Sequence, residues 1–114
     1  MDGCIFCKIA SGQIPSKKVY EDDSLIAFHD ISPKAPVHVV VIPKLHIAST
    51  NDLKDIDDSL ASHILKQLPK IAEMLNVSNS GYRVVINCGE NGGQSVEHLH
   101  FHVLGGRILQ WPPG

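Results

Sequence analysis

Changes in the spacing of apolar residues divide the 114-residue chain into short strands and one long helix. Residues 16–30 predict two short strands around a turn at residues 22–24. Residues 36–44 carry a β-branched run between two prolines, which predicts an inner strand of a sheet. Two further strands are expected within 80–90 and 97–106, separated by a glycine-rich loop.

Between about Ile56 and Leu75 the apolar period becomes helical. Apolar side chains recur at steps of three and four, which places one stripe on a helix at Leu60, Ile64, Leu68, Ile71 and Leu75. Asp55, Asp57 and Asp58 are expected at the helix start, where the dipole favours anions, and Pro69 should kink the helix or remove one hydrogen bond. The stripe must bury against the chain's own sheet or a partner's helix, and the sequence leaves both open.

This order of elements predicts a single α+β domain over residues 1–114 with an antiparallel sheet. Hydrophobic residues make up 43% of the chain and charged residues 19%, which is ordinary globular usage. The net charge of −2 comes without a basic run, so neither a nucleic acid polymer nor a membrane surface is an expected partner. The chain shows no apolar run of about 18 residues and no signal-peptide pattern, so a cytoplasmic location is expected.

Three histidines, His98, His100 and His102, stand two residues apart near the C-terminal end. On a strand this spacing puts all three imidazoles on one face, with neighbours about 7 Å apart. The residues between them are apolar and would cover the other face: Leu99, Phe101 and Val103. A solvated polar face is the alternative, but threonine or aliphatic residues would suit a sheet better, so the pattern favours an active site.

A glycine-rich loop, CGENGGQS at residues 88–95, precedes this strand. Gly89, Gly92 and Gly93 are expected to take positive φ and to bring backbone N–H groups close to an anion, with Asn87 and Ser95 as neutral donors. A plain hairpin turn would also explain the glycines. Beside a row of imidazoles, the loop favours a phosphoryl group as ligand. The chain has no Walker-type lysine motif, which disfavours an ordinary nucleoside triphosphatase.

A second motif, Cys4-x-x-Cys7, lies near the N-terminus. Such a pair supplies half of a tetrahedral zinc site, although a redox dithiol and two plain buried thiols are alternatives. An odd total of three cysteines argues against a disulfide framework. Cys88 is expected to be a small core residue.

The stretch GGQSVEHLHFHVL resembles the signature of the histidine triad (HIT) family, in which three histidines alternate with hydrophobic residues. The similarity extends over essentially the whole chain, through CIFCKIASGQIPSKKVYEDD, IAFHDISPKAP, VIPKLHI and LGGRILQWPPG. It is strongest to the Hint branch, the histidine triad nucleotide-binding proteins, because of the WPPG terminus. The resemblance implies a five-stranded antiparallel sheet with one long helix and a short N-terminal helix. It also implies a homodimer in which two sheets merge into ten strands.

The resemblance further implies a purine nucleoside 5′-phosphoramidate hydrolase. Substrates would be adenosine 5′-monophosphoramidate and aminoacyl-adenylates, with AMP or GMP as bound nucleotides. His100 would be the nucleophile that forms a nucleotidyl-histidine intermediate, and His102 would contact the phosphate. His38 would support the nucleophile, and the backbone carbonyl near His98 would hold its second ring nitrogen.

Substrate-binding and metal-binding residues follow from the same resemblance. Asp30 would accept hydrogen bonds from the ribose hydroxyls. The remaining substrate positions are Phe28, His29 and Ile31 at the base, Asn87, Gly93, Gln94, Ser95 and Val96 at the phosphate, and Trp111 in a tail that reaches the partner's active site. A structural zinc would be bound by Cys4, Cys7, His46 and His98, and no cofactor would be required for the chemistry.

Two other functions remain open at the level of sequence. The first is a nucleotide-binding regulatory protein whose hydrolysis is incidental. The second is a dinucleoside polyphosphate hydrolase of a neighbouring branch. The expected base pocket is largely apolar, so no preference between adenine and guanine is predicted.

Overall fold

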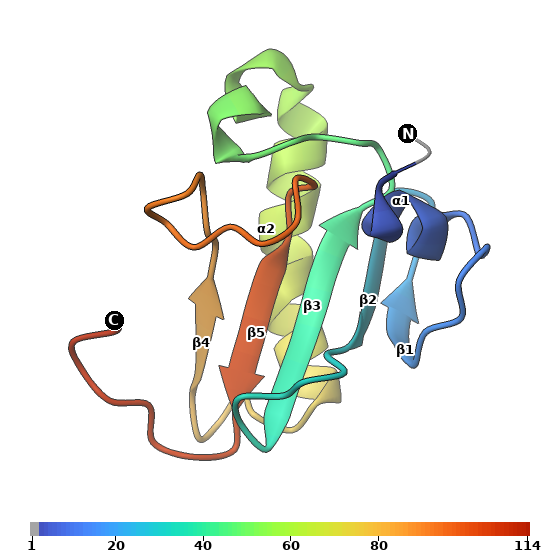
Figure 1. Cartoon of the computed structure of the whole chain (residues 1–114). Helices are drawn as coiled ribbons and strands as arrows, with labels where there is room; N and C mark the ends of the chain where they lie inside the picture. The colour runs from blue at the N-terminus through green and yellow to red at the C-terminus, as the bar shows by residue number, and fades with distance from the viewer. Residues whose placement is uncertain (1–2) are drawn as a thin grey trace.

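The computed structural model describes residues 3–114, which fold into one antiparallel sheet and helices on its two sides (Figure 1). The elements in chain order are α1 (Ile5–Ala10), β1 (Lys18–Glu21), β2 (Leu25–His29), β3 (Val37–Pro43), the 3₁₀ helix η1 (Thr50–Asp55), α2 (Asp58–Met74), β4 (Tyr82–Val85) and β5 (Phe101–Gly105). Within residues 3–114, none of the helices has the length and apolar character that crossing a bilayer requires.

The sheet has five strands in the order β1-β2-β3-β5-β4, and every neighbouring pair is antiparallel. The α+β class, the antiparallel sheet and the short N-terminal helix are therefore confirmed. β3 lies at the centre, as its β-branched run predicts, and its register places Val40 opposite His102. This pairing brings the histidine segment against the most protected strand of the sheet.

Each face of the sheet has its own apolar core because strand side chains alternate between faces. On one face, Val39, Val41 and Phe101 pack with residues of α2, which lies behind the sheet in Figure 1. On the other face, Phe28 and Val40 pack with Ile9 of α1 and with neighbouring apolar residues. The triad histidines belong to this second face, on the side of the sheet away from the long helix.

The long helix begins at Asp58, not at Ile56, and Asp57 caps it by accepting a hydrogen bond from Ser59 N. Asp55, which was expected at the helix start, lies at the end of η1 instead. α2 continues through Pro69. The predicted apolar stripe is buried against the chain's own sheet, with Ile64, Leu68 and Ile71 inside and Leu60 and Leu75 at its ends.

Strand β5 begins at Phe101, although the alternating pattern predicted a strand from residue 97. The last ladder pair is Val41 with Phe101, so continuing the register would place Leu99 opposite Pro43. A proline has no N–H to donate, and the ladder ends there. The N–H of Leu99 bonds to the carbonyl of Ile47 instead, at 2.6 Å. His98 and His100 therefore lie in the segment that leads into the strand.

Candidate active site

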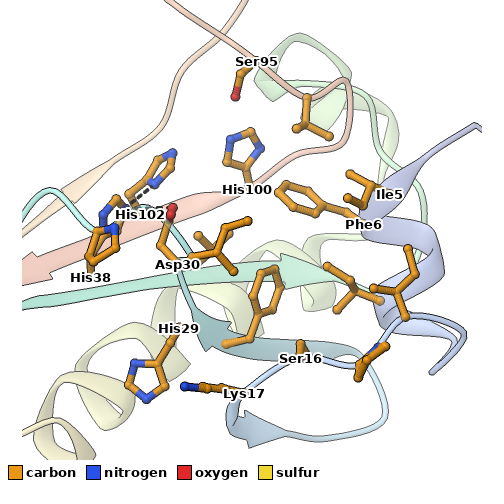
Figure 2. Close-up of a pocket in the computed structure, with 18 of the residues that line it drawn as sticks. Ile5, Phe6, Ser16, Lys17, His29, Asp30, His38, Ser95, His100 and His102 are labelled. Atoms are coloured by element: carbon orange, nitrogen blue, oxygen red, sulfur yellow. Dashed lines mark hydrogen bonds and ion pairs between the residues drawn. The ribbon is translucent and has the colours of Figure 1, made fainter.

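An open pocket of about 1180 Å³ lies on the sheet face opposite α2. α1, the end of β2, β3 and the loop before β5 contribute its walls (Figure 2). Nine residues predicted for catalysis or binding meet there: Phe28, His29, Asp30, Ile31, His38, Ser95, Val96, His100 and His102. The structure thus brings together residues that lie up to 74 positions apart in the chain, from Phe28 to His102.

His100 is held in one orientation by the backbone. Its Nδ1 lies 2.7 Å from the carbonyl oxygen of His98, and its side chain is almost fully buried. Because a carbonyl only accepts hydrogen bonds, Nδ1 carries the proton and Nε2 of the neutral ring keeps a lone pair. The rings of Phe6 and His102 pack against it at centroid distances of 5.1 and 5.0 Å.

A chain of hydrogen bonds also fixes the tautomer of His102. The backbone N–H of Lys34 donates to Nδ1 of His38 at 3.0 Å, so the neutral His38 carries its proton on Nε2. That nitrogen lies 2.8 Å from Nδ1 of His102 and donates to it (dashed in Figure 2). Neutral His102 must then carry its own proton on Nε2. The pocket therefore combines one imidazole lone pair, on His100, with one imidazole donor, on His102.

Burial keeps these supporting rings neutral. Desolvation, together with the nearby His100 and His38, lowers the pKa of His102 from 6.5 to about 4. Burial also lowers the pKa of His38, although Asp30 opposes that change with Oδ2 at 3.4 Å from the His38 ring. At neutral pH both rings are uncharged, as the hydrogen-bond chain requires.

Acidification is expected to destabilise the fold between about pH 6.5 and pH 4. The unfolded chain protonates His102 near its ordinary pKa, whereas the folded chain does so only near pH 4, so falling pH favours the unfolded state. The free energy of unfolding should drop by about 2–3 kcal/mol over this range from His102 alone. Urea unfolding at several pH values measures the drop.

Two variants test whether His102 is the source of this pH dependence of the free energy of unfolding. His102→Gln removes the titrating ring and should flatten the dependence. His29→Gln changes an exposed ring at the pocket mouth and should leave the dependence as in the parent protein. Equal slopes in the parent and in His102→Gln would contradict the assignment.

The glycine-rich loop is shaped by its own hydrogen bonds. Gly89 and Gly93 have positive φ, as expected, but Gly92 does not. Gly92 is required for another reason, because a Cβ there would lie 2.3 Å from the carbonyl oxygen of Cys88. Asn87 donates its side-chain amide to the carbonyl of Gly92 at 2.7 Å. The structure therefore places Asn87 and Gly93 within the loop, outside the pocket lining.

Gln94 braces the loop in the same way. Its side-chain amide donates to the carbonyls of Ala48 and Val96, and its side-chain oxygen accepts from Gly89 N. Gln94 is likewise absent from the lining, whereas Ser95 and Val96 border the pocket. The loop thus presents the Ser95 hydroxyl beside His100, as Figure 2 shows.

The end of β2 forms the opposite wall. Asp30 accepts a hydrogen bond from Ser32 N at 2.7 Å through Oδ1. Phe28 is buried in the floor of the pocket, whereas Ile31 is 99% exposed at its rim. The carboxylate therefore stands between an apolar floor and the solvent.

Sequence reasoning missed the wall contributed by α1 and the segment after it. Ile5, Phe6 and Ile9 of α1 line the pocket, followed by Ile14 and Pro15. The three apolar residues of α1 follow the spacing i, i+1 and i+4 of one helix face, which is a readable signal. A helix of only six residues gives too short a pattern for that signal to stand out.

Trp111 does not reach the pocket of its own chain. Its side chain is 79% exposed, with the guanidinium of Arg83 5.9 Å from the ring centroid. The C-terminal segment runs outside β4, on the side of the sheet away from α1 (Figure 1). The expected contact of Trp111 with a partner's active site therefore stays a prediction.

Cys4, Cys7, His46 and His98 form a compact cluster whose ligand atoms all lie within 4.8 Å of one another. His98 donates its Nε2 proton to the carbonyl of Pro43 at 2.8 Å, which leaves the Nδ1 lone pair facing the sulfurs. Sulfur-to-nitrogen and nitrogen-to-nitrogen distances of 3.2–3.5 Å link the four side chains. A tetrahedral ion with bonds of 2.0–2.3 Å separates its ligands by about 3.3–3.8 Å. The cluster could therefore hold a metal ion.

Cys88 lies outside this cluster and is only partly buried. Hydrogen bonds from Thr50 and Ser49 lower the pKa of its thiol. It is therefore a loop residue in contact with the start of η1, and the expectation of a core residue was wrong.

Comparisons with known proteins agree with this geometry. Residues 3–108 match the family model described as "Scavenger mRNA decapping enzyme C-term binding". An uncharacterised HIT-like protein of Synechococcus elongatus is 49% identical over 96% of both chains, and protein pkiA of Dictyostelium discoideum is 47% identical over 96% of this chain and 88% of its own.

Solved structures show the same similarity. A HIT family hydrolase from Legionella pneumophila is 50% identical with a TM-score of 0.94, over 98% of this chain and all (100%) of that one. A histidine triad protein from Clostridium difficile is 51% identical with a TM-score of 0.86, over 96% of this chain and 95% of that one.

Proposed function

Because the chain belongs to the histidine triad family, we propose that it is a hydrolase of purine nucleoside 5′-phosphoramidates, of the Hint branch. The observation that carries the proposal is the orientation of His100. Its Nδ1 is committed to the His98 carbonyl at 2.7 Å, so its Nε2 lone pair is free to attack an electrophile in the pocket.

In the proposed reaction, Nε2 of His100 attacks the α-phosphorus in line with the phosphorus–nitrogen bond. That bond breaks, the amine departs with a proton taken from solvent water, and a nucleotidyl-histidine remains. Water then cleaves the new phosphorus–nitrogen bond and releases the nucleoside monophosphate and free His100. Splitting one displacement into two lowers each barrier.

His102 and Ser95 would stabilise the charge on the phosphoryl oxygens. The hydrogen-bond chain through His38 fixes the proton of neutral His102 on Nε2, and the Ser95 hydroxyl lies beside His100. Fixed donors of this kind stabilise developing charge without reorganising during the reaction. Asp30 would accept hydrogen bonds from the ribose hydroxyls, which suits an ionised carboxylate.

A structural zinc ion is part of the proposal. Cys4, Cys7, His46 and His98 supply two thiolates and two imidazoles, a set that zinc prefers and that leaves no open coordination position. Zinc would fix α1 and the His98 segment in place. The reaction itself would be carried by His100 and its neighbours.

We also propose a homodimer, with a location in the cytoplasm. β4 is an edge strand of the sheet, and Tyr82 at its start is partly exposed. Unpaired backbone groups on such an edge are suited to pairing with a second copy, which would join two five-stranded sheets. The exposed Trp111 lies beside Arg83 of β4 and would extend towards the partner.

A direct comparison of substrates tests the activity. Adenosine 5′-phosphoramidate is expected to be turned over at least about 100-fold faster, by kcat/KM, than a diadenosine polyphosphate. Comparable values would favour a dinucleoside polyphosphate hydrolase. Tight AMP binding without turnover of either would favour a regulatory nucleotide-binding protein.

A further inference from the structure

One buried hydroxyl has no hydrogen-bond partner. Oγ of Ser16 is hidden from solvent, and no donor or acceptor among the described residues reaches it. Buried polar groups are nearly always paired, because leaving one unpaired costs stability. Within residues 3–114, Ser16 is the sole side chain with a buried polar atom that lacks a hydrogen-bond partner, and this exception needs a physical explanation.

Ser16 lies in the wall of the pocket, far from the chemistry. It borders the cavity together with Ile14, Pro15 and Phe28. Figure 2 shows it at the opposite end from Ser95 and His100. The segment is fastened to the sheet just beyond it, where His29 N donates to the carbonyl of Lys17 at 3.0 Å. The unpaired hydroxyl is therefore held in an apolar region at a defined place.

We propose that Ser16 is a specificity-determining residue that hydrogen-bonds to the 6-substituent of the purine, the amino group of adenine or the oxygen of guanine. This rests on the proposed function, which puts the phosphate at His100 and the ribose at Asp30. The base then extends to the far end of the pocket with its six-membered ring edge pointing away from the sugar. Lys17 and His29 also line this end of the pocket, but Ser16 is the polar side chain there whose buried hydroxyl has no partner within the described residues.

The hydroxyl must turn to make this contact. Solvent does not reach Oγ in its present position, and a serine side chain moves between three staggered positions about its Cα–Cβ bond. When the Ser16 hydroxyl turns into the pocket, it gains the hydrogen-bond partner that it lacks in its buried position. A hydroxyl both donates and accepts, so it suits the 6-amino group of adenine and the 6-oxygen of guanine. Unsubstituted purine keeps its ring nitrogens but lacks the 6-substituent, so it cannot make this particular contact.

The test compares three 5′-phosphoramidates, of adenosine, guanosine and unsubstituted purine riboside. In Ser16→Ala, kcat/KM for adenosine, guanosine or both should fall roughly 3- to 10-fold, the size of one hydrogen bond. The value for purine riboside should stay within about twofold of the parent protein. Ser11→Ala is the matched control, because the Ser11 hydroxyl is exposed and bonds to Lys8 O outside the pocket.

A second measurement separates binding from folding. Ser16→Ala removes an unpaired buried group and should leave Tm unchanged or raise it by about 2–5 °C. Calorimetric binding of AMP, GMP and purine riboside monophosphate should repeat the pattern seen in turnover, and it gives a result even if nothing is hydrolysed.

Three outcomes would overturn the assignment of Ser16: equal loss for all three bases, no loss for any, or a clear fall in Tm. In each of these the phosphoramidase proposal stands as long as the parent protein turns over a substrate. A parent protein that is inactive on all three substrates would instead overturn the proposed function, while the binding pattern would still decide the role of Ser16.

Discussion

Replacing His100 with alanine is expected to lower kcat/KM for adenosine 5′-phosphoramidate by at least about 1000-fold. Among the described residues, His100 is the one pocket-lining imidazole with a ring nitrogen fixed by a backbone carbonyl, at 2.7 Å, and the variant loses it. Binding of AMP should persist within a few-fold, because the ribose and base contacts remain. Steady-state kinetics and calorimetry together measure the two effects.

Intact-protein mass spectrometry after rapid mixing identifies the intermediate. The parent protein should gain the mass of one nucleotidyl group, and peptide mapping should place it on a peptide that contains His100, whereas His100→Ala should gain no such mass. His63→Ala is the matched control, because His63 lies on α2 and contacts Asp22 at 2.7 Å, away from the pocket. An adduct on another residue, or retained turnover in His100→Ala, would contradict covalent catalysis by His100.

Replacing Cys7 with serine is expected to remove bound zinc and to lower Tm by about 10 °C or more. The cluster joins α1, the segment after β3 and the segment before β5, so its loss releases three parts of the chain at once. Structural zinc contributes several kcal/mol to folding, and about 1 kcal/mol corresponds to several degrees in a domain of this size. Elemental analysis and thermal unfolding check the prediction.

Cys88→Ser is the control for that experiment, since Cys88 lies outside the cluster. It should retain one equivalent of zinc and an almost unchanged Tm. A strong chelator should reproduce the effect of Cys7→Ser on the parent protein and have no further effect on the variant. A parent protein that binds no zinc would rule out the metal site.

The sequence alone predicted those helices and strands whose pattern of apolar residues shows directly which side chains are buried. The β-branched run between Pro36 and Pro43 predicted an inner strand, and the spacing of Ile64, Leu68 and Ile71 predicted the buried face of α2. The start of β5 could not be predicted in this way. It is set by a proline on the neighbouring strand, and the partner of a strand is not visible in its own sequence.

The candidate site could also be predicted only in part from the sequence. Histidine spacing and family resemblance pointed to the residues that meet in the pocket, but not to how each polar group is used. Asn87 and Gln94 looked like phosphate donors, yet their amides bond to carbonyls within and beside the loop. Which amides remain free depends on the path of the loop, and this follows from the close approach of Gly92 to Cys88.

Helix α1 has only six residues, and isolated helices of that length do not persist in water. This short helix and its N-cap residue Cys4 supply two thiols to the Cys/His cluster, and the helix places the Phe6 ring against His100. Whatever fastens α1 therefore also decides whether the pocket has a wall beside His100. A fusion partner joined next to Cys4 is therefore expected to disturb the pocket beside His100, and a purification tag at this position should be avoided.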